Sequence, residues 1–214
     1  MNNPESIKVV LLGESGVGKA ELISQFVAPK FDPHRETSLS AQFISKTLEF
    51  PELGQSIKFD IWDTVGQEKY RSLSKIFYKD AKVIILVYDI TSKSSLEELK
   101  NYWYKEVKYN NDNNPILAVV ANKIELYNYQ EVSNQEGKEF ADKIGAIFQT
   151  TSTINDSGVN TLFDNIAKTY LIPGYDYKIG YSKEQEEFIK KKKSEKNKRE
   201  KGLVLSNIYK YYSY

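Results

Sequence analysis

The sequence predicts an α/β domain with a mostly parallel six-stranded sheet, one antiparallel edge strand and helices on both faces. Apolar runs typical of strands alternate with segments of helical apolar spacing from residue 7 to residue 173. Two of the runs, KVIILVYDI and PILAVVANK, are apolar over most of their length, which is typical of strands buried on both faces. The glycine-rich segment GESGVGKA at 13–20 joins the first run to the first helical segment.

The first part of the chain supplies three strands and one helix. Residues 7–12 form a mostly apolar run that ends at Gly13, as expected of a buried strand that leads into a tight loop. KAELISQFV follows with apolar residues at helical spacing. AQFISKTLEF has mixed faces, and PELGQ turns it back into SIKFDIWD, so we expect an antiparallel hairpin near the sheet edge.

The rest of the domain alternates strands with helices. In chain order we expect a strand at KVIILVYDI, a helix at SSLEELKNYWYKEVK, a strand at PILAVVANK, a helix at SNQEGKEFADKIG, a strand at AIFQT and a helix at VNTLFDNIAKTYLIPG. The first of these helices has a predicted capping box at Ser95 and Glu98, and the second has one at Ser133 and Glu136.

Composition predicts one domain followed by a charged extension. The chain has 214 residues, of which 40% are hydrophobic, and a formal net charge of +1, so nothing in the charge predicts nucleic acid as a partner. We place the domain at 6–173 and a charged, tyrosine-rich extension at 174–214. Residues 183–201 hold nine basic and five acidic side chains, a net charge of +4, which marks them as a tail.

The absence of cysteine excludes several kinds of chemistry. A disulfide scaffold, a cysteine metal site, thiol catalysis and a lipid attached to cysteine all require that residue. No apolar run is long enough to span a bilayer and no secretion signal is visible, so we expect a cytoplasmic protein, at most peripheral on endomembranes. Lys190, Lys191, Lys192 and Lys193 could contact anionic lipid, but a solvated charged helix is favoured because acidic residues are interleaved.

GESGVGK has the pattern of a phosphate-binding loop. Its glycines allow backbone N–H groups to converge on phosphate oxygens at the start of a helix, and Lys19 supplies a positive charge for the terminal phosphates. The predicted nucleotide contacts here are Gly13, Ser15, Gly16, Val17, Gly18, Lys19 and Ala20. Ala20 departs from the pattern, because a serine or threonine hydroxyl normally holds magnesium at that position.

A second segment, DTVGQE, follows a predicted strand and fits the phosphate end of a nucleotide. Ligands bind at the C-terminal ends of strands in open α/β sheets. Asp63 can orient magnesium there, Gly66 can offer its N–H to a γ-phosphate, and Gln67 can orient an attacking water.

Two more segments at strand ends fit a base. In NKIE, Asn122 and Lys123 precede Glu125, whose carboxylate can accept hydrogen bonds from the N1 and N2 donors of guanine. Adenine presents a different edge and would leave that carboxylate unpaired. In TTST, the backbone of Thr151, Ser152 and Thr153 could close over the base.

With FDIWDTVGQEKYRSL, IFYKDA and ILVYDIT also present, the sequence resembles the Ras-like small GTPases and, within them, the Rab family, over about residues 6–172. The resemblance implies a P-loop G domain of three layers that switches between GTP and GDP in vesicle-mediated and intracellular protein transport. Effector, exchange and activating proteins would bind through switch regions at 32–44 and 63–78. GTP hydrolysis to GDP and phosphate is expected to be weak or absent without such a partner.

The resemblance also assigns roles to five further residues. It implies that Phe31 packs against the guanine and that Ser38 binds magnesium and senses the γ-phosphate. Phe43, Trp62 and Tyr78 match the aromatic trio under the family's effector surface, although plain core packing is an alternative for all three.

The departures from the family pattern concern the metal, switch and base positions. Ala20 has no oxygen, Ser38 replaces threonine, and Glu125 replaces aspartate with one more methylene. We therefore expect Mg²⁺, held at Ser38 and Asp63, to bind weakly, hydrolysis to be slow and base selectivity to be reduced. The alternative is a pseudo-GTPase that keeps the G-domain fold as an interaction module without productive cycling.

Overall fold

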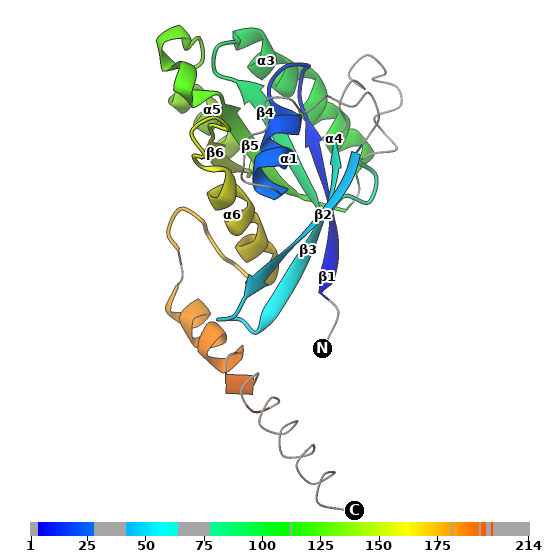
Figure 1. The fold of residues 1–214 in the computed structure, drawn as a ribbon, viewed down its shortest axis with the longest axis vertical. Coiled ribbons are helices and arrows are strands. Elements are labelled where there is room, and N and C mark those ends of the chain that lie inside the picture. The colour runs from blue at the N-terminus through cyan, green and yellow to red at the C-terminus, as the bar shows by residue number, and fades with distance from the viewer. Residues whose placement is uncertain are drawn as a thin grey trace, which may run out of the picture.

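A six-stranded sheet of order β2-β3-β1-β4-β5-β6 forms the centre of the fold (Figure 1). The computed structural model describes residues 4–27, 42–63, 78–111, 113–180, 182–192, 194–195 and 198. The strands are β1 (Glu5–Leu12), β2 (Gln42–Phe50), β3 (Gln55–Asp63), β4 (Val83–Asp89), β5 (Ile116–Asn122) and β6 (Ile147–Thr150). Only the β2–β3 pair is antiparallel among these neighbours, so the predicted fold class is confirmed.

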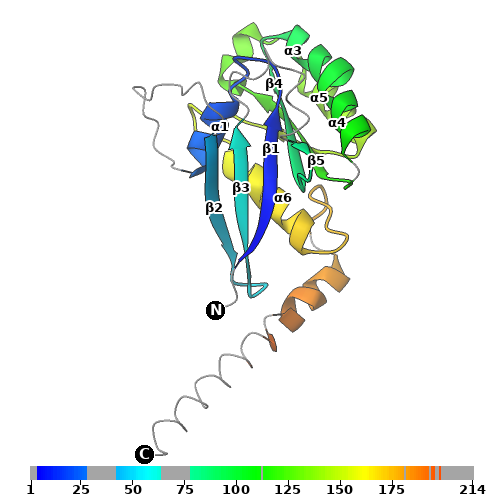
Figure 2. The same ribbon diagram turned by 90° about the vertical axis from the view of Figure 1, so that its right-hand side faces the viewer.

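Helices cover both faces of the sheet (Figures 1 and 2). One face carries α1 (Lys19–Val27) and α6 (Val159–Leu171), which contact each other. The opposite face carries α3 (Lys93–Glu98), the π-helical turn η2 (Leu99–Trp103), α4 (Tyr104–Asn110) and α5 (Asn134–Ile144). A short 3₁₀ segment, η3 (Ile124–Tyr129), follows β5.

Strand β4 explains why the fold has a core on each side of the sheet. All seven of its residues are buried. Because side chains alternate across a strand, Val83, Ile85 and Val87 enter the core under α1 and α6. Ile84, Leu86 and Tyr88 enter the core under the other helices. A strand covered on both faces has no polar side, which accounts for the unbroken apolar run in its sequence.

The predicted capping box at Ser95 and Glu98 is wrong. The N-cap is Ser92, whose hydroxyl accepts a hydrogen bond from the Ser95 N–H at 3.3 Å. Ser95 lies inside the helix, and its buried hydroxyl donates to the Ser92 carbonyl at 2.7 Å and to the Asp89 carbonyl at 3.3 Å. Several serines in this segment can cap a helix, and burial of Ser95 against the end of β4 selects the earlier one.

The capping box of α5 is confirmed, and so is the glycine that ends this helix. The Ser133 N–H donates to the Glu136 carboxylate at 2.8 Å, and the Glu136 N–H donates to the Ser133 hydroxyl at 3.2 Å. Gly145 follows the helix with φ +68°, a left-handed conformation that glycine adopts readily.

The first part of the extension contacts the domain. Tyr175, Tyr177, Phe188 and Ile189 pack against the core under α1 and α6. Residues 183–192 are helical and lie beyond the end of α6 (Figure 1). No helix in the described part of the chain has the length and apolar character that crossing a membrane requires. The boundary at residue 173 stays a prediction.

Candidate functional site

The loop between β1 and α1 fits against the ends of two neighbouring strands only because it is rich in glycine. Gly13 and Gly18 have φ values of +151° and +95°. A Cβ atom on Gly13 would lie 2.2 Å from the Val87 carbonyl oxygen of β4, and one on Gly18 would lie 2.2 Å from Nδ2 of Asn122 in β5. Both distances are shorter than any real contact, so these two positions exclude a side chain and hold the loop close to the sheet.

Lys19 holds a positive charge at this loop. Its side chain is only 5% exposed, and its Nζ donates to the carbonyl oxygens of Gly13 at 2.9 Å and Glu14 at 2.8 Å. The residue also begins α1, whose first backbone N–H groups have no partner within the helix. A fixed ammonium beside the N-terminus of a helix is an arrangement that binds phosphate.

Asn122 joins the phosphate loop to both predicted base segments. It is 1% exposed, and its Nδ2 donates to the Val17 carbonyl at 2.9 Å. Its Oδ1 accepts a hydrogen bond from the Thr151 hydroxyl at 2.9 Å. The structure thus brings together the phosphate loop, NKIE and TTST, which lie far apart in the sequence.

Glu125 contains an unsatisfied buried acceptor. Its Oε2 is buried and has no hydrogen-bond partner among the described residues. A buried carboxylate oxygen without a donor is costly, so a ligand that supplies an N–H would lower the free energy of this site. The residue therefore fits a base that presents hydrogen-bond donors.

The segment after β6 has a fixed shape. Thr151, Ser152 and Thr153 are buried. The Ser152 and Ser157 backbones exchange hydrogen bonds at 2.9 and 3.0 Å, and the Thr151 N–H donates to the Ala121 carbonyl at 2.8 Å. The loop is therefore held against β5, next to Asn122.

Comparison with known proteins agrees with this geometry. The model of the Ras family matches residues 8–172. The Ras-related protein Rab-22A of Homo sapiens is 39% identical over 170 residues, which cover 79% of this chain and 85% of the relative. The Ras-related protein Rab-31 of Mus musculus is 38% identical over 162 residues, covering 76% and 82%. The chain is a divergent Rab-family small GTPase. Its family binds GTP or GDP together with Mg²⁺.

Several predicted site residues of this Rab lie outside the described residues. They are Phe31, Ser38, Gly66, Gln67 and the side chain of Asp63. Ala20 is described, is half-buried and carries no oxygen on its side chain. Within the described ranges, no cluster of three or more histidine, cysteine or acidic side chains could hold a metal ion. The described residues therefore fit a nucleotide, whereas the magnesium ligands stay predictions.

Two of the three predicted effector-surface aromatics contact each other in this Rab. Phe43 and Trp62 are paired across β2 and β3, with ring centroids 5.2 Å apart and ring planes inclined at 66°. Phe43 is 53% exposed, and Lys8 Nζ lies 5.2 Å from the centroid of the Trp62 ring. Tyr78 is fully buried, and its hydroxyl lies 3.1 Å from the Glu106 carboxylate. The exposed Phe43 is therefore the member best placed to contact another protein.

Asp89 belongs to the site although it was not among the predicted site residues. Its Oδ2 forms an ion pair with Lys123 Nζ at 2.7 Å, and its Oδ1 accepts from the Thr91 N–H at 2.8 Å. Lys123 has the left-handed φ of +65°, which turns the chain sharply after β5. The signal in the sequence is a single acidic residue at the end of the buried run VIILVYD.

Proposed function

We propose that this Rab is a guanine-nucleotide switch of vesicle traffic in which magnesium is held weakly and GTP is hydrolysed slowly. The observation that carries the nucleotide part is the side chain of Asn122, which joins the phosphate loop to both base segments. Such a connection keeps the distance between the two ends of a nucleotide site constant, which favours a ligand with phosphates at one end and a base at the other.

The phosphate end of the proposed site consists of the glycine loop and Lys19. The backbone N–H groups of Ser15, Gly16, Val17, Gly18 and Ala20 would donate to phosphate oxygens. In the structure, Lys19 donates to two loop carbonyls at 2.8 and 2.9 Å. When a nucleotide binds, its ammonium group would donate to the terminal phosphates instead of to these carbonyls. That exchange is favourable because a charge-assisted hydrogen bond to phosphate is stronger than one to a neutral carbonyl.

The base end of the proposed site depends on Glu125. Its buried Oε2, which has no partner in the described part of the chain, would accept from N1–H and N2–H of guanine. Because a glutamate is one methylene longer than the aspartate it replaces, the carboxylate is held less rigidly. We therefore expect guanine to be preferred over adenine, with a smaller margin than an aspartate would give.

Ala20 is the reason for proposing weak magnesium binding. Bound magnesium neutralises charge on the β- and γ-phosphates and needs a nearly octahedral set of oxygen ligands. Ala20 offers none, so Ser38 and Asp63 would be the only side-chain ligands. Gln67 would orient the attacking water, and poor charge neutralisation would make that step slow. The same observation favours a second candidate, a pseudo-GTPase module that does not cycle.

Protein partners would bind through residues 32–44 and 63–78. The exposed Phe43 over Trp62 supports a contact there, since clustered aromatic residues are common at interface centres. We place the protein in the cytoplasm, where it would meet endomembranes peripherally. Lys190 and its three following lysines would then contribute only a weak attraction to anionic lipid.

Competition binding tests the nucleotide part. The purified protein is titrated with fluorescent GDP, which is then displaced with unlabelled GDP or ADP. We expect GDP to compete far better than ADP, and Glu125→Ala to weaken GDP binding by about tenfold while leaving ADP binding almost unchanged. Glu49→Ala, which removes an exposed carboxylate from β2, is the matched control and should behave as the wild type. A folded protein that contains no nucleotide and binds no GDP would contradict the switch.

A further inference from the structure

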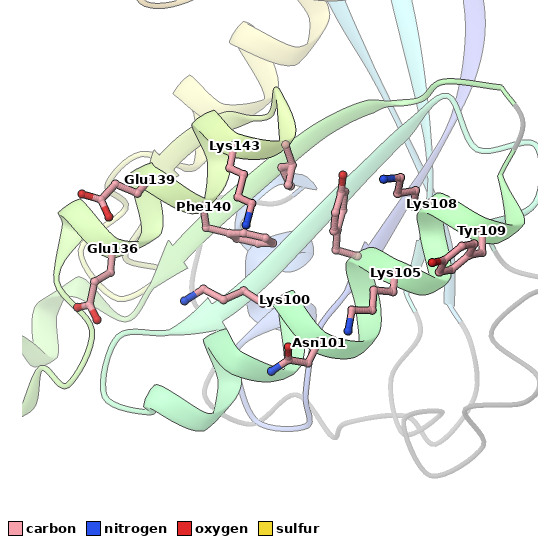
Figure 3. A pocket seen from close by; sticks show the side chains of 11 residues that line it. Lys100, Asn101, Lys105, Lys108, Tyr109, Glu136, Glu139, Phe140 and Lys143 are labelled. Atoms are coloured by element: carbon pink, nitrogen blue, oxygen red, sulfur yellow. The ribbon is translucent and has the colours of Figure 1, made fainter.

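A groove of about 590 Å³ lies between η2 and α4 on one side and α5 on the other (Figure 3). Its charged lining consists of four lysines and two glutamates. The lysines are Lys100, Lys105 and Lys108 from the first side and Lys143 from α5. None of these residues belongs to the nucleotide site or to the segments proposed as switches.

Three of the four lysines lack an ion-pair partner within the part of the chain that the structure describes. They are Lys105, Lys108 and Lys143. Lys100 is paired with Glu97 at 3.0 Å. Unpaired cations on both walls of one groove repel each other weakly and attract an anion placed between them.

The two glutamates of the groove are already hydrogen-bonded within α5. The Glu136 carboxylate accepts from the Ser133 N–H and hydroxyl, which hold the pKa of Glu136 below its usual value. Glu139 accepts from the Gln135 side chain at 2.8 Å. Figure 3 shows both glutamates at the opposite end of the groove from Lys105 and Lys108. The groove therefore has a positive end that its own acids do not reach.

The middle of the groove is apolar. Phe140 is 7% exposed, and its ring packs edge-on against Tyr104 with centroids 6.0 Å apart. Ile144 is half-buried beside them. The π-helical turn η2 carries Lys100 into the groove wall, and such turns are rare and occur frequently at functional sites. An apolar side chain of a ligand could cover this middle section.

We propose that the groove binds an acidic segment of a partner protein, with one apolar side chain over Phe140 and carboxylates against the lysines. The lysines are spread out: Lys100 and Lys108 are eight residues apart, about 12 Å along a helix. A row of carboxylates matches that spread better than a single phosphate group does. The groove also lacks arginine, the residue that grips phosphate with two parallel hydrogen bonds.

Fluorescence anisotropy with the full chain tests this proposal. The probes are a pool of labelled peptides of about 12 residues, each with glutamates around one phenylalanine or leucine, and the same peptides with lysine in place of glutamate. The test variant is Lys105→Glu with Lys108→Glu. The matched control is Lys190→Glu with Lys191→Glu, which changes the net charge equally at two exposed lysines outside the groove. Vesicles containing phosphatidylserine form a separate arm.

We expect at least one acidic peptide to bind saturably, the lysine peptides not to bind, and added salt to weaken binding. The test variant should lose about tenfold in affinity and the control less than about twofold. The proposal is wrong if no acidic peptide binds the wild type, if both variants lose affinity equally, or if the vesicles but not the peptides bind through Lys105 and Lys108.

Discussion

The side chain of Asn122 donates a hydrogen bond to the Val17 carbonyl at 2.9 Å, across 105 residues of sequence. Because Asn122 ends β5 and Val17 lies in the loop after β1, this bond ties the phosphate loop directly to a base segment. The Thr151 hydroxyl completes the connection by donating to Asn122 Oδ1.

Removing this connection should damage both stability and nucleotide binding. Asn122→Ala leaves the buried Val17 carbonyl and Thr151 hydroxyl without their partner, so we expect the free energy of unfolding to fall by about 2 kcal/mol. GDP affinity should fall as well, because the loop is no longer held in place. Urea denaturation and GDP titration measure the two effects. Asn113→Ala, at an exposed asparagine, is the control and should change the free energy by less than about 0.5 kcal/mol.

Two glycines of the loop should differ sharply in their tolerance of alanine. A Cβ on Gly18 would overlap Nδ2 of Asn122, whereas a Cβ on Gly16 meets nothing within 4 Å. Both have positive φ, so both substitutions are strained by about 1 kcal/mol, but only Gly18→Ala must also displace Asn122. We expect Gly18→Ala to abolish GDP binding and Gly16→Ala to keep it. Equal loss in both variants would show that strain alone controls this loop.

The extension should stabilise the exposed edge of the sheet through Tyr177. Strand β6 has β5 on one side only, and the Phe148 N–H donates to the Tyr177 hydroxyl at 2.9 Å. Tyr177→Phe removes that acceptor, so we expect a loss of about 1 kcal/mol and faster hydrogen exchange at the Phe148 amide. Tyr129→Phe, at a residue 74% exposed, is the control. Unchanged exchange at Phe148 would mean that the contact contributes nothing.

The contact between Tyr170 and Glu5 should make stability sensitive to alkaline pH. Burial, together with the hydrogen bond to Glu5 and the charge of Glu5, raises the pKa of Tyr170 to about 12. An unfolded tyrosine has a pKa of about 10, so the folded state holds this proton more tightly. The contribution is therefore complete below about pH 10 and is lost as the pH rises to about 12. Tyr170→Phe should lose less free energy of unfolding over that interval than the wild type, and equal losses would refute this assignment.

Sequence patterns predict the structure correctly where a single local property decides it. The unbroken apolar run of β4 follows from burial on both faces, and the phosphate loop follows from glycines placed between a strand and a helix. The Ser133 capping box was predictable because both of its partners lie within one turn. The three segments of the site could be expected to meet because parallel strands end at the same edge of the sheet.

Features decided by tertiary packing could not be predicted in this way. The choice of Ser92 over Ser95 as N-cap depends on the burial of Ser95 against Asp89. The π-helical turn at Leu99–Trp103 has no local sequence signal, and its two end residues are both buried in the core. The contact of Tyr177 with Phe148 joins residues 29 apart with no periodic pattern between them.

We propose above all that Ala20 deprives the site of a magnesium ligand. The test of this proposal is the rate of release of fluorescent GDP, measured once with excess Mg²⁺ and once with EDTA. The proteins compared are the wild type, Ala20→Ser, Ala20→Thr and Ala20→Val. The last two form a matched pair, because threonine and valine differ mainly by a hydroxyl. We predict that Mg²⁺ slows release only slightly in the wild type and Ala20→Val, but by about tenfold more in Ala20→Ser and Ala20→Thr. A wild type whose release is already strongly slowed by Mg²⁺, with no further change in the serine and threonine variants, would contradict the claim.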